Sequence, residues 1–291
     1  GRYEVVSRLG HGGMGVVYLA KDPKIGRLVA IKLVSQEFDS PDALSAGTLR
    51  HPNIVTIFDV GEHEGLRFIA MEYIEGKTLG EIVKREARPP IQQRIQWVED
   101  LCSALAYAHR QDLTHLDIKP ANVMIDTEGS PKILDFGLAR RDASQFRQSH
   151  VIIGTPNYMS PEQIRGSNLD TRSDIFSVGV LFYEVLTFKA AFPGAVHQTM
   201  HRILHEEPEP VETYIPGVDA QLATILARAI VKDRDGRYAD LTAMKNDLAE
   251  VRQRIESAAM AATMKPLDWE ALFRARVVAP MTQRLAVEMK Q

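Results

Sequence analysis

The pattern of apolar and polar positions changes character along the chain. Up to about residue 74, short runs of β-branched and aliphatic residues are separated by glycine and Asp-Pro turns, which is typical of antiparallel strands. The runs are Val5-Val6, Val16–Leu19, Leu28–Ile31, Ile54–Phe58 and Phe68–Met71. This pattern predicts a small β-rich lobe over residues 1–74.

After Gly76 the apolar period becomes helical. Apolar residues recur at three- and four-residue steps between Ile91 and Ala108, which predicts one long amphipathic helix. Later helices are expected over Asp174–Leu186, Thr199–His205, Ala220–Val231 and Leu241–Ser257. The predicted fold class is therefore α+β, a bilobal chain whose larger α-helical lobe covers residues 75–257.

Residues 258–291 are predicted to be a C-terminal helical extension, broken near Pro266 and Pro280. Two interpretations stay open for it. It is either a helix packed on the larger lobe or a regulatory or dimerising segment, so a homodimer remains an open alternative for this chain.

Composition narrows the class of protein. The 291 residues are 45% hydrophobic and 25% charged, as in ordinary globular proteins, and a net charge of −3 gives no electrostatic case for nucleic acid. The only cysteine is Cys102, so no disulfide can form within the chain, which suits a reducing compartment. The most apolar stretch is interrupted by Glu184 and Lys189, so no membrane span is predicted. We expect a cytoplasmic location, with an anchor outside this chain left open.

A glycine-rich loop lies between two predicted strands. Gly10, Gly12 and Gly15 have the spacing G-x-G-x-x-G, which also occurs in dinucleotide-binding folds. Those folds need a helix directly after the loop, whereas Val16–Ala20 has the pattern of a strand. A hairpin whose backbone N–H groups approach phosphate oxygens is therefore favoured.

Lys32 ends the apolar strand Val29-Ala30-Ile31. Taken alone it would be a solvated lysine at a strand edge. It follows the glycine loop closely enough for one sheet to present both to a ligand. At this point the chain resembles the small lobe of a protein kinase, and the resemblance implies that Lys32 holds the α- and β-phosphates of ATP.

The segment from His115 to Asn122 has the residues of a catalytic loop. Asp117 and Asn122 lie five residues apart on a turn, where the carboxylate can orient a hydroxyl and accept its proton while the amide oxygen binds Mg²⁺. Lys119 can offset charge that develops on a transferred phosphoryl group. A single Asp here could simply cap a turn, but the combined spacing favours catalysis.

Asp135-Phe136-Gly137 follows a short apolar run, and its carboxylate can bridge Mg²⁺ to the β- and γ-phosphates. Downstream, residues 154–162 resemble the end of a kinase activation segment, and residues 170–179 resemble the start of the central helix of the large lobe. The resemblance implies that Asp174 caps and braces the catalytic loop. It also implies a structural ion pair between Glu162 and Arg237.

These motifs stand in the same order as in bacterial eukaryotic-like (Hanks-type) serine/threonine protein kinases, which the chain resembles from Tyr3 to Ser257. The resemblance implies transfer of the γ-phosphoryl group of ATP to Ser or Thr hydroxyls of protein substrates, including the kinase itself, with ATP and Mg²⁺ as cofactors. Lys119 and the sequence Gly154-Thr155-Pro156 favour Ser/Thr over Tyr as the acceptor. The adenine slot implied by the resemblance is lined by Leu9, Val17, Ala30, Met71 and Met124, with hinge contacts from the Glu72 carbonyl and the Ile74 N–H.

Two positions depart from the family pattern. Leu116 replaces the Arg that commonly pairs with a phosphorylated activation loop, so we expect less dependence on such phosphorylation. The segment from Leu33 to Arg50 is too short for the helix that should carry a Glu partner for Lys32. Glu37 is present in it, but it lies too close to the strand end to be favoured as that partner. Either the segment is shortened or residues are missing near Ser45-Ala46. These departures motivate one alternative, a pseudokinase that acts as a nucleotide-binding scaffold or regulatory module.

Overall fold

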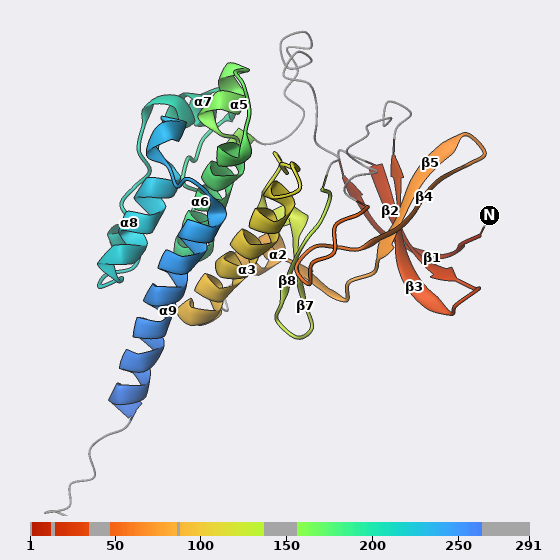
Figure 1. Cartoon of the computed structure of the whole chain (residues 1–291), viewed down its shortest axis with the longest axis horizontal. Coiled ribbons are helices and arrows are strands. Elements are labelled where there is room, and N and C mark those ends of the chain that lie inside the picture. The colour runs from red at the N-terminus through yellow and green to blue at the C-terminus, as the bar shows by residue number, and fades with distance from the viewer. Residues whose placement is uncertain (1, 13–14, 35–46, 86–87, 137–155, 264–291) are drawn as a thin grey trace, which may run out of the picture. The chain divides into compact units, whose positions relative to one another are not determined.

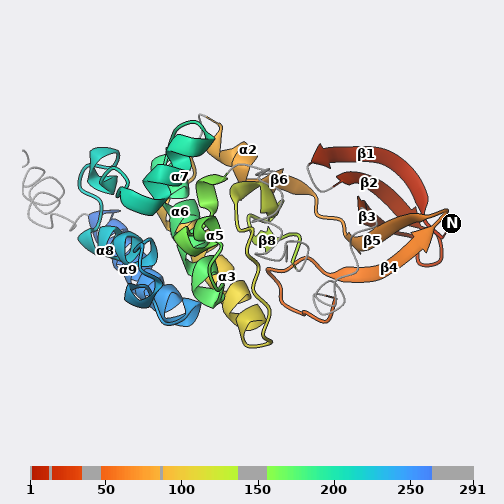
Figure 2. The same ribbon diagram turned by 90° about the horizontal axis from the view of Figure 1, so that it is seen from above.

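Five strands form an antiparallel sheet in the N-terminal part of the chain. The computed structural model describes residues 2–12, 15–34, 47–85, 88–136 and 156–263. In these residues the strand order is β1-β2-β3-β5-β4, which Figure 2 shows in sequence across the sheet. Their bounds are β1 Glu4–Gly12, β2 Gly15–Asp22, β3 Arg27–Val34, β4 Ile57–His63 and β5 Leu66–Glu72.

The two faces of this sheet have different roles. Val29 and Ile31 of β3 pack with Ala20 and Ala70 on one face, where aromatic side chains cover them. Residues of a strand alternate between faces, so Ala30 and Lys32 point to the opposite one. β3 is buried on both faces, because Val29 and Ile31 belong to one apolar cluster and Ala30 to another, which explains its continuous apolar run.

The expected strand Ile54–Phe58 is divided between two partners. Its second half begins β4 at Ile57, whereas Ile54 forms a parallel bridge with Ile133, and the Val55 N–H donates to the Ile133 carbonyl at 2.9 Å. The start of the strand was therefore predicted wrongly, because the apolar run continues while its hydrogen-bonding partner changes.

A small second sheet connects the N-terminal sheet to the helical lobe. It contains β6 Gly76–Thr78, β7 Val123–Asp126 and β8 Pro131–Ile133 in that order. A Cβ on Gly76 would lie 2.1 Å from the Ile125 carbonyl oxygen, so only glycine allows β6 to approach β7 this closely. The short helix α2, Leu79–Val83, starts directly after β6 with a capping box between Thr78 and Glu81.

Helices form the remainder of the described chain. Their bounds are α3 Ile91–His109, α5 Pro161–Arg165, α6 Thr171–Thr187, α7 Val196–His205, α8 Ala220–Ala229 and α9 Leu241–Thr263, with 3₁₀ turns η1 Pro120–Asn122, η2 Pro156–Tyr158, η3 Val211–Thr213 and η4 Arg234–Gly236. Helix α6 is nearly all buried, and α3 and α8 lie beside it (Figure 1). Gly179 allows α8 to approach α6, because a Cβ there would lie 2.8 Å from the Ala229 Cβ.

The observed elements confirm the predicted α+β bilobal fold class, and every predicted helix up to Ser257 is present within a few residues. The chain divides into two compact units, Gly1–Arg252 and Gln253–Gln291. Helix α9 continues to Thr263, and the predicted breaks near Pro266 and Pro280 lie outside the described residues. No helix in the described part of the chain is both long and apolar enough to cross a membrane.

Candidate active site

Two side chains predicted to be catalytic, Asp117 and Lys119, and the predicted metal ligand Asn122 lie in direct contact before β7. The Lys119 ammonium donates to both carboxylate oxygens of Asp117, at 2.9 and 2.7 Å. The Asn122 amide nitrogen donates to the Asp117 carbonyl at 2.8 Å and to its carboxylate at 2.9 Å. Asp117 and Lys119 are partly exposed while Asn122 is buried, so one end of the cluster is anchored and the other is open to solvent.

Asp174, fully buried on α6, holds the backbone of this loop. Its carboxylate accepts hydrogen bonds from the His115 and Leu116 N–H groups at 2.8 and 2.7 Å and contacts the His109 imidazole at 2.8 Å. The role implied by the resemblance, that Asp174 caps and braces the catalytic loop, is therefore observed. The N-cap of α6 itself is Asp170, which accepts from the Arg172 N–H.

Leu116 has a left-handed backbone, with φ of 62°. This conformation costs a non-glycine residue about 1–2 kcal/mol. Asp174 holds the Leu116 N–H, and the Gln163 side chain donates to the Leu116 carbonyl at 2.8 Å. These bonds hold the strained turn that places Asp117 beside Lys119.

Asp135 contacts the N-terminal sheet at Lys32 of β3. The Lys32 ammonium donates to the Asp135 carboxylate at 2.7 Å, and Lys32 is only 4% exposed. A buried ammonium needs such a partner, because an unpaired charge away from water is costly. The pair joins residues 103 positions apart in the chain.

Backbone contacts connect this pair to the catalytic loop. The Leu134 N–H donates to the Asn122 carbonyl at 2.9 Å, and the His115 imidazole bonds the Leu134 carbonyl at 2.9 Å. The His115 ring also contacts Phe136 edge-on, with centroids 4.7 Å apart. The four predicted polar residues Lys32, Asp117, Asn122 and Asp135 thus belong to one network.

The apolar residues expected to line the adenine slot also gather on the face that carries Lys32. Ala30, Met71 and Val55 are buried together, with Val17, Ile74 and Leu134 packed against them. Of the other two residues expected in the slot, Leu9 on β1 is 45% exposed, and Met124 on β7 is half-buried. Neither is part of this buried cluster.

Gly10 and Gly12 lie in β1 and Gly15 begins β2, so a strand follows the glycine-rich loop, as the sequence pattern predicts. Gly12 pairs with Gly15, which has a φ of 125°. A Cβ on Gly15 would lie 2.0 Å from the Leu33 carbonyl oxygen, so a side chain there has no room. A Cβ on Gly10 would meet nothing within 4 Å, which leaves its backbone approachable.

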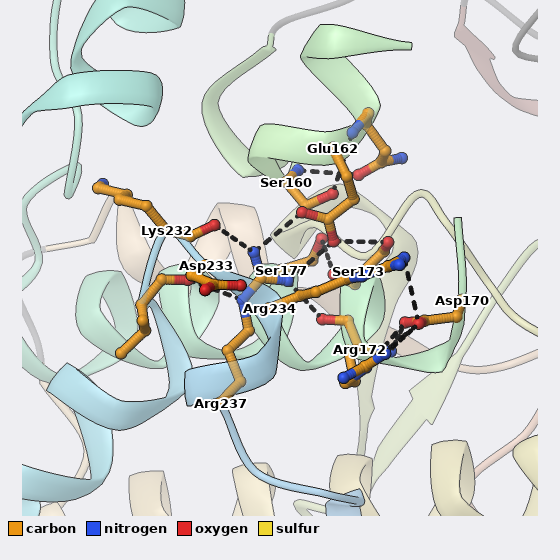
Figure 3. Close-up of polar contacts among 12 residues, drawn as sticks. Ser160, Glu162, Asp170, Arg172, Ser173, Ser177, Lys232, Asp233, Arg234 and Arg237 are labelled. Carbon is orange, nitrogen blue, oxygen red and sulfur yellow. Dashed lines mark hydrogen bonds and ion pairs between the residues drawn. The ribbon is translucent and has the colours of Figure 1, made fainter. Parts of the chain in front are cut away.

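The predicted ion pair between Glu162 and Arg237 is confirmed. The guanidinium donates to both carboxylate oxygens, at 2.8 and 2.9 Å, and the Ser173 hydroxyl donates to the same carboxylate at 2.7 Å (Figure 3). Burial pushes the pKa of Glu162 upward, but the bonds and charge of Arg237 outweigh it, so the pKa lies below its usual value. The pair fixes the start of α5 to the turn before α9.

Several residues singled out from the sequence lie outside the part of the chain that the structure describes. Glu37 and the Ser45-Ala46 junction lie outside the described residues, and so do Gly137 and the segment 138–155, which includes Thr155. Among described residues, no three His, Cys, Asp or Glu side chains gather as a metal cluster.

Two polar contacts at the site were missed by sequence reasoning. The ion pair between Glu72 and Lys132, at 2.7 Å, could have been suspected from a charged residue in the apolar run before Asp135. The second contact is the bond from the Gln163 side chain to the Leu116 carbonyl of the catalytic loop. The sequence indicates it only weakly, through the capping-box spacing of Ser160 and Gln163.

Comparison with known proteins identifies the class that this fold and network define. A family model described as the protein kinase domain matches residues 3–247, so the chain belongs to the protein kinase family. Within it, the chain resembles bacterial serine/threonine kinases, as its motifs indicate.

The relatives are larger proteins. The chain is 37% identical over 266 residues to serine/threonine-protein kinase PknB of Mycobacterium leprae, and 36% identical over 267 residues to PknB of Mycobacterium tuberculosis; each match covers 86% of this chain and 43% of the relative. It is 36% identical over 270 residues to the probable serine/threonine-protein kinase PknB of Bifidobacterium longum, covering 85% of this chain and 39% of the relative. The chain therefore spans less than half the length of these relatives.

Proposed function

We propose that this chain is a kinase domain that transfers the γ-phosphoryl group of ATP to Ser or Thr hydroxyls of protein substrates, other copies of itself among them. The observation that carries the proposal is the contact of Lys32 with Asp135 at 2.7 Å, because it brings the phosphate-binding sheet and the metal loop to one place. The network around Asp117 lies one backbone contact away, through Leu134 and Asn122.

In this reaction the acceptor hydroxyl oxygen attacks the γ-phosphorus, and the bond from that phosphorus to the β–γ bridging oxygen breaks. The leaving group is ADP. Asp117 orients the hydroxyl and takes its proton, since its carboxylate is partly exposed and fixed by Asn122. Lys119, bonded to the same carboxylate, offsets charge developing on the transferred group.

The nucleotide would lie along the face of the sheet that carries Lys32. Lys32 would bind the α- and β-phosphates, and the backbone of the Gly10–Gly15 turn would cover them. The adenine would lie among the apolar side chains around Ala30 and Met71, with its edge read by the Glu72 carbonyl and the Ile74 N–H. The lysine would exchange Asp135 for phosphate as the nucleotide enters.

The residues around Asp135 also fit Mg²⁺. Asn122 donates through its amide nitrogen to Asp117, so the amide oxygen is the atom that could ligate, and Asp135 supplies a carboxylate. Mg²⁺ usually takes one or two oxygen ligands from the protein and fills its other coordination positions with phosphate oxygens and water. When bound there, the ion would neutralise charge on the β- and γ-phosphates.

We place this activity in the cytoplasm, where ATP and protein substrates are available to a chain with one buried, unpaired cysteine. The scaffold alternative depends on Leu116 and the short segment after Leu33. Against it, Lys32, Asp117 and Asp135 are all present and connected.

The test is transfer of labelled phosphate from ATP with Mg²⁺ to the chain itself and to a generic basic protein. Asp117→Asn should lower the rate by at least about 100-fold, the usual contribution of a positioned acid or base. Nucleotide binding, measured in parallel, should persist in that variant. Binding without any transfer by the unmodified chain would refute the proposal and support the scaffold alternative.

A further inference from the structure

The carboxylate of Glu72 joins three segments at the start of the hinge. One oxygen accepts the Lys132 ammonium of β8 at 2.7 Å, and the other accepts the Thr56 N–H at 3.2 Å. The Glu72 N–H returns a bond to the Thr56 carbonyl at 2.9 Å. The two side chains of the ion pair are 28% and 19% exposed, so they are partly shielded from water.

The segment before Thr56 is itself attached to β8. The Ile133 N–H donates to the Asn53 carbonyl at 2.8 Å, and the Val55 N–H donates to the Ile133 carbonyl at 2.9 Å. The Asn53 side chain adds a bond to the Pro131 carbonyl at 2.8 Å. Residues 53–56 therefore connect β5 to β8, and the Glu72–Lys132 pair closes a ring of contacts around that connection.

This ring connects the two ends of the proposed nucleotide site. Glu72 ends β5 and begins the hinge that would read adenine, while Lys132 stands three residues before Asp135. Asp135 in turn contacts Lys32, which is paired with Ile69 of β5. Movement of the hinge away from β8 would therefore separate the adenine contacts from the metal loop.

We propose that the Glu72–Lys132 ion pair is a positioning element that keeps the hinge against β8 and thereby slows dissociation of the nucleotide. The inference rests on the proposed function, because it concerns the same ATP site. Neither side-chain charge needs to touch the nucleotide. Opening of a kinase-type site for release is a conformational step that often limits turnover, and breaking this pair would make opening easier.

The experiment compares Lys132→Met with the unmodified chain, and Glu72 is left intact because its carbonyl belongs to the proposed adenine site. Dissociation of a fluorescent ADP analogue is followed by stopped flow, and kcat and KM for ATP are measured with the same preparations. An ion pair of this exposure is a modest interaction, so we expect dissociation to quicken about three- to tenfold, KM to rise with it and kcat not to fall.

Two controls separate positioning from a general loss of stability. Lys132→Arg keeps the charge and should restore slow dissociation. Arg252→Met removes a pair that is at least as well shielded, Arg252 with Glu99 at 2.6 Å, in the helical part of the chain, and should leave dissociation unchanged.

Unchanged dissociation in Lys132→Met would overturn the inference, and so would a loss of kcat in proportion to the unfolded fraction. If the unmodified chain bound no ADP analogue, the proposed function would fail and this inference with it. Normal binding by the unmodified chain together with unaltered variants would remove this inference alone.

Discussion

Arg237→Met removes the cation that neutralises a buried carboxylate. Glu162 is 5% exposed and Arg237 4%, and the two are joined by a bidentate contact (Figure 3). The substitution would leave Glu162 with only the Ser173 hydroxyl as a partner among these groups. Breaking one side of a buried pair typically costs about 3–5 kcal/mol of unfolding free energy.

That loss is a large share of the roughly 5–15 kcal/mol that stabilises a folded protein. At roughly 2–4 °C per kcal/mol for a chain of this size, Tm should fall by about 6–20 °C. Urea unfolding followed by circular dichroism at pH 8 measures the free energy directly. The double variant Arg237→Met/Glu162→Leu should recover part of the loss, because it no longer buries a lone charge. It should not recover all, since Arg237 also donates to the Val231 and Arg172 carbonyls.

The pH dependence gives a second measure of the same pair. In the native chain the pKa of Glu162 is lowered, so its stabilising contribution is present above the unfolded value of about 4.3 and is lost as pH falls through the folded value. Without Arg237, burial alone would raise that pKa, and protonation would then favour the folded state. The stability gap between the variant and the native chain should therefore narrow as pH falls from 8 to 5.

Arg234→Met is the matched control. Arg234 is 36% exposed and bonds the Asn168 carbonyl and the Asp170 carboxylate, so its loss should cost at most about 1 kcal/mol. The reasoning would be refuted if Arg237→Met stayed within that range, or if the double variant were no more stable than the single one.

Three further predictions concern separate parts of the chain. Gly15→Ala would place a methyl group 2.0 Å from the Leu33 carbonyl at a φ of 125°, so the hairpin must distort, and KM for ATP should rise more than kcat falls; wild-type kinetics would contradict this. Ser144 and Ser149, which lie between Asp135 and Gly154, are the serines that activation-loop phosphorylation could modify. Ser144→Ala with Ser149→Ala should retain most kinase activity, because Leu116 replaces the usual phosphate-binding arginine of the catalytic loop; activity reduced to background would show that phosphorylation is required. Burial lowers the pKa of Lys232 to about 8, whereas its unfolded value is about 10.4. The folded state therefore binds the proton less tightly than the unfolded state, and the free energy of unfolding should rise as pH increases between these two values. Lys232→Met should abolish this rise in urea unfolding, and an equal rise in both proteins would exclude Lys232 as its source.

The local arrangement of the site follows from sequence spacing. Asp117, Lys119 and Asn122 stand within five residues on one turn, so their contacts need little more than the local chain to form. The long helix α3 was likewise predictable, because a helical face repeats every few residues whatever it packs against.

Contacts between distant segments depended on the tertiary structure. The run Ile54–Phe58 has the composition of one strand, yet its first part pairs with β8 and its second part joins β5. Asp170 and Asp174 are both plausible helix caps by residue type, but only the packing of α6 against the catalytic loop assigns the second to bracing.

The amino-acid sequence alone therefore predicts the family of the chain, the order of its elements and the chemical groups of its site. Which partner each of those groups takes was decided in three dimensions. Lys32 contacts Asp135 across 103 residues, and Glu72 contacts Lys132 across 60. The physical reason is that backbone periodicity and turn chemistry act over a few neighbouring residues, whereas the pairing of buried charges depends on which surfaces the packed sheet and helices bring together.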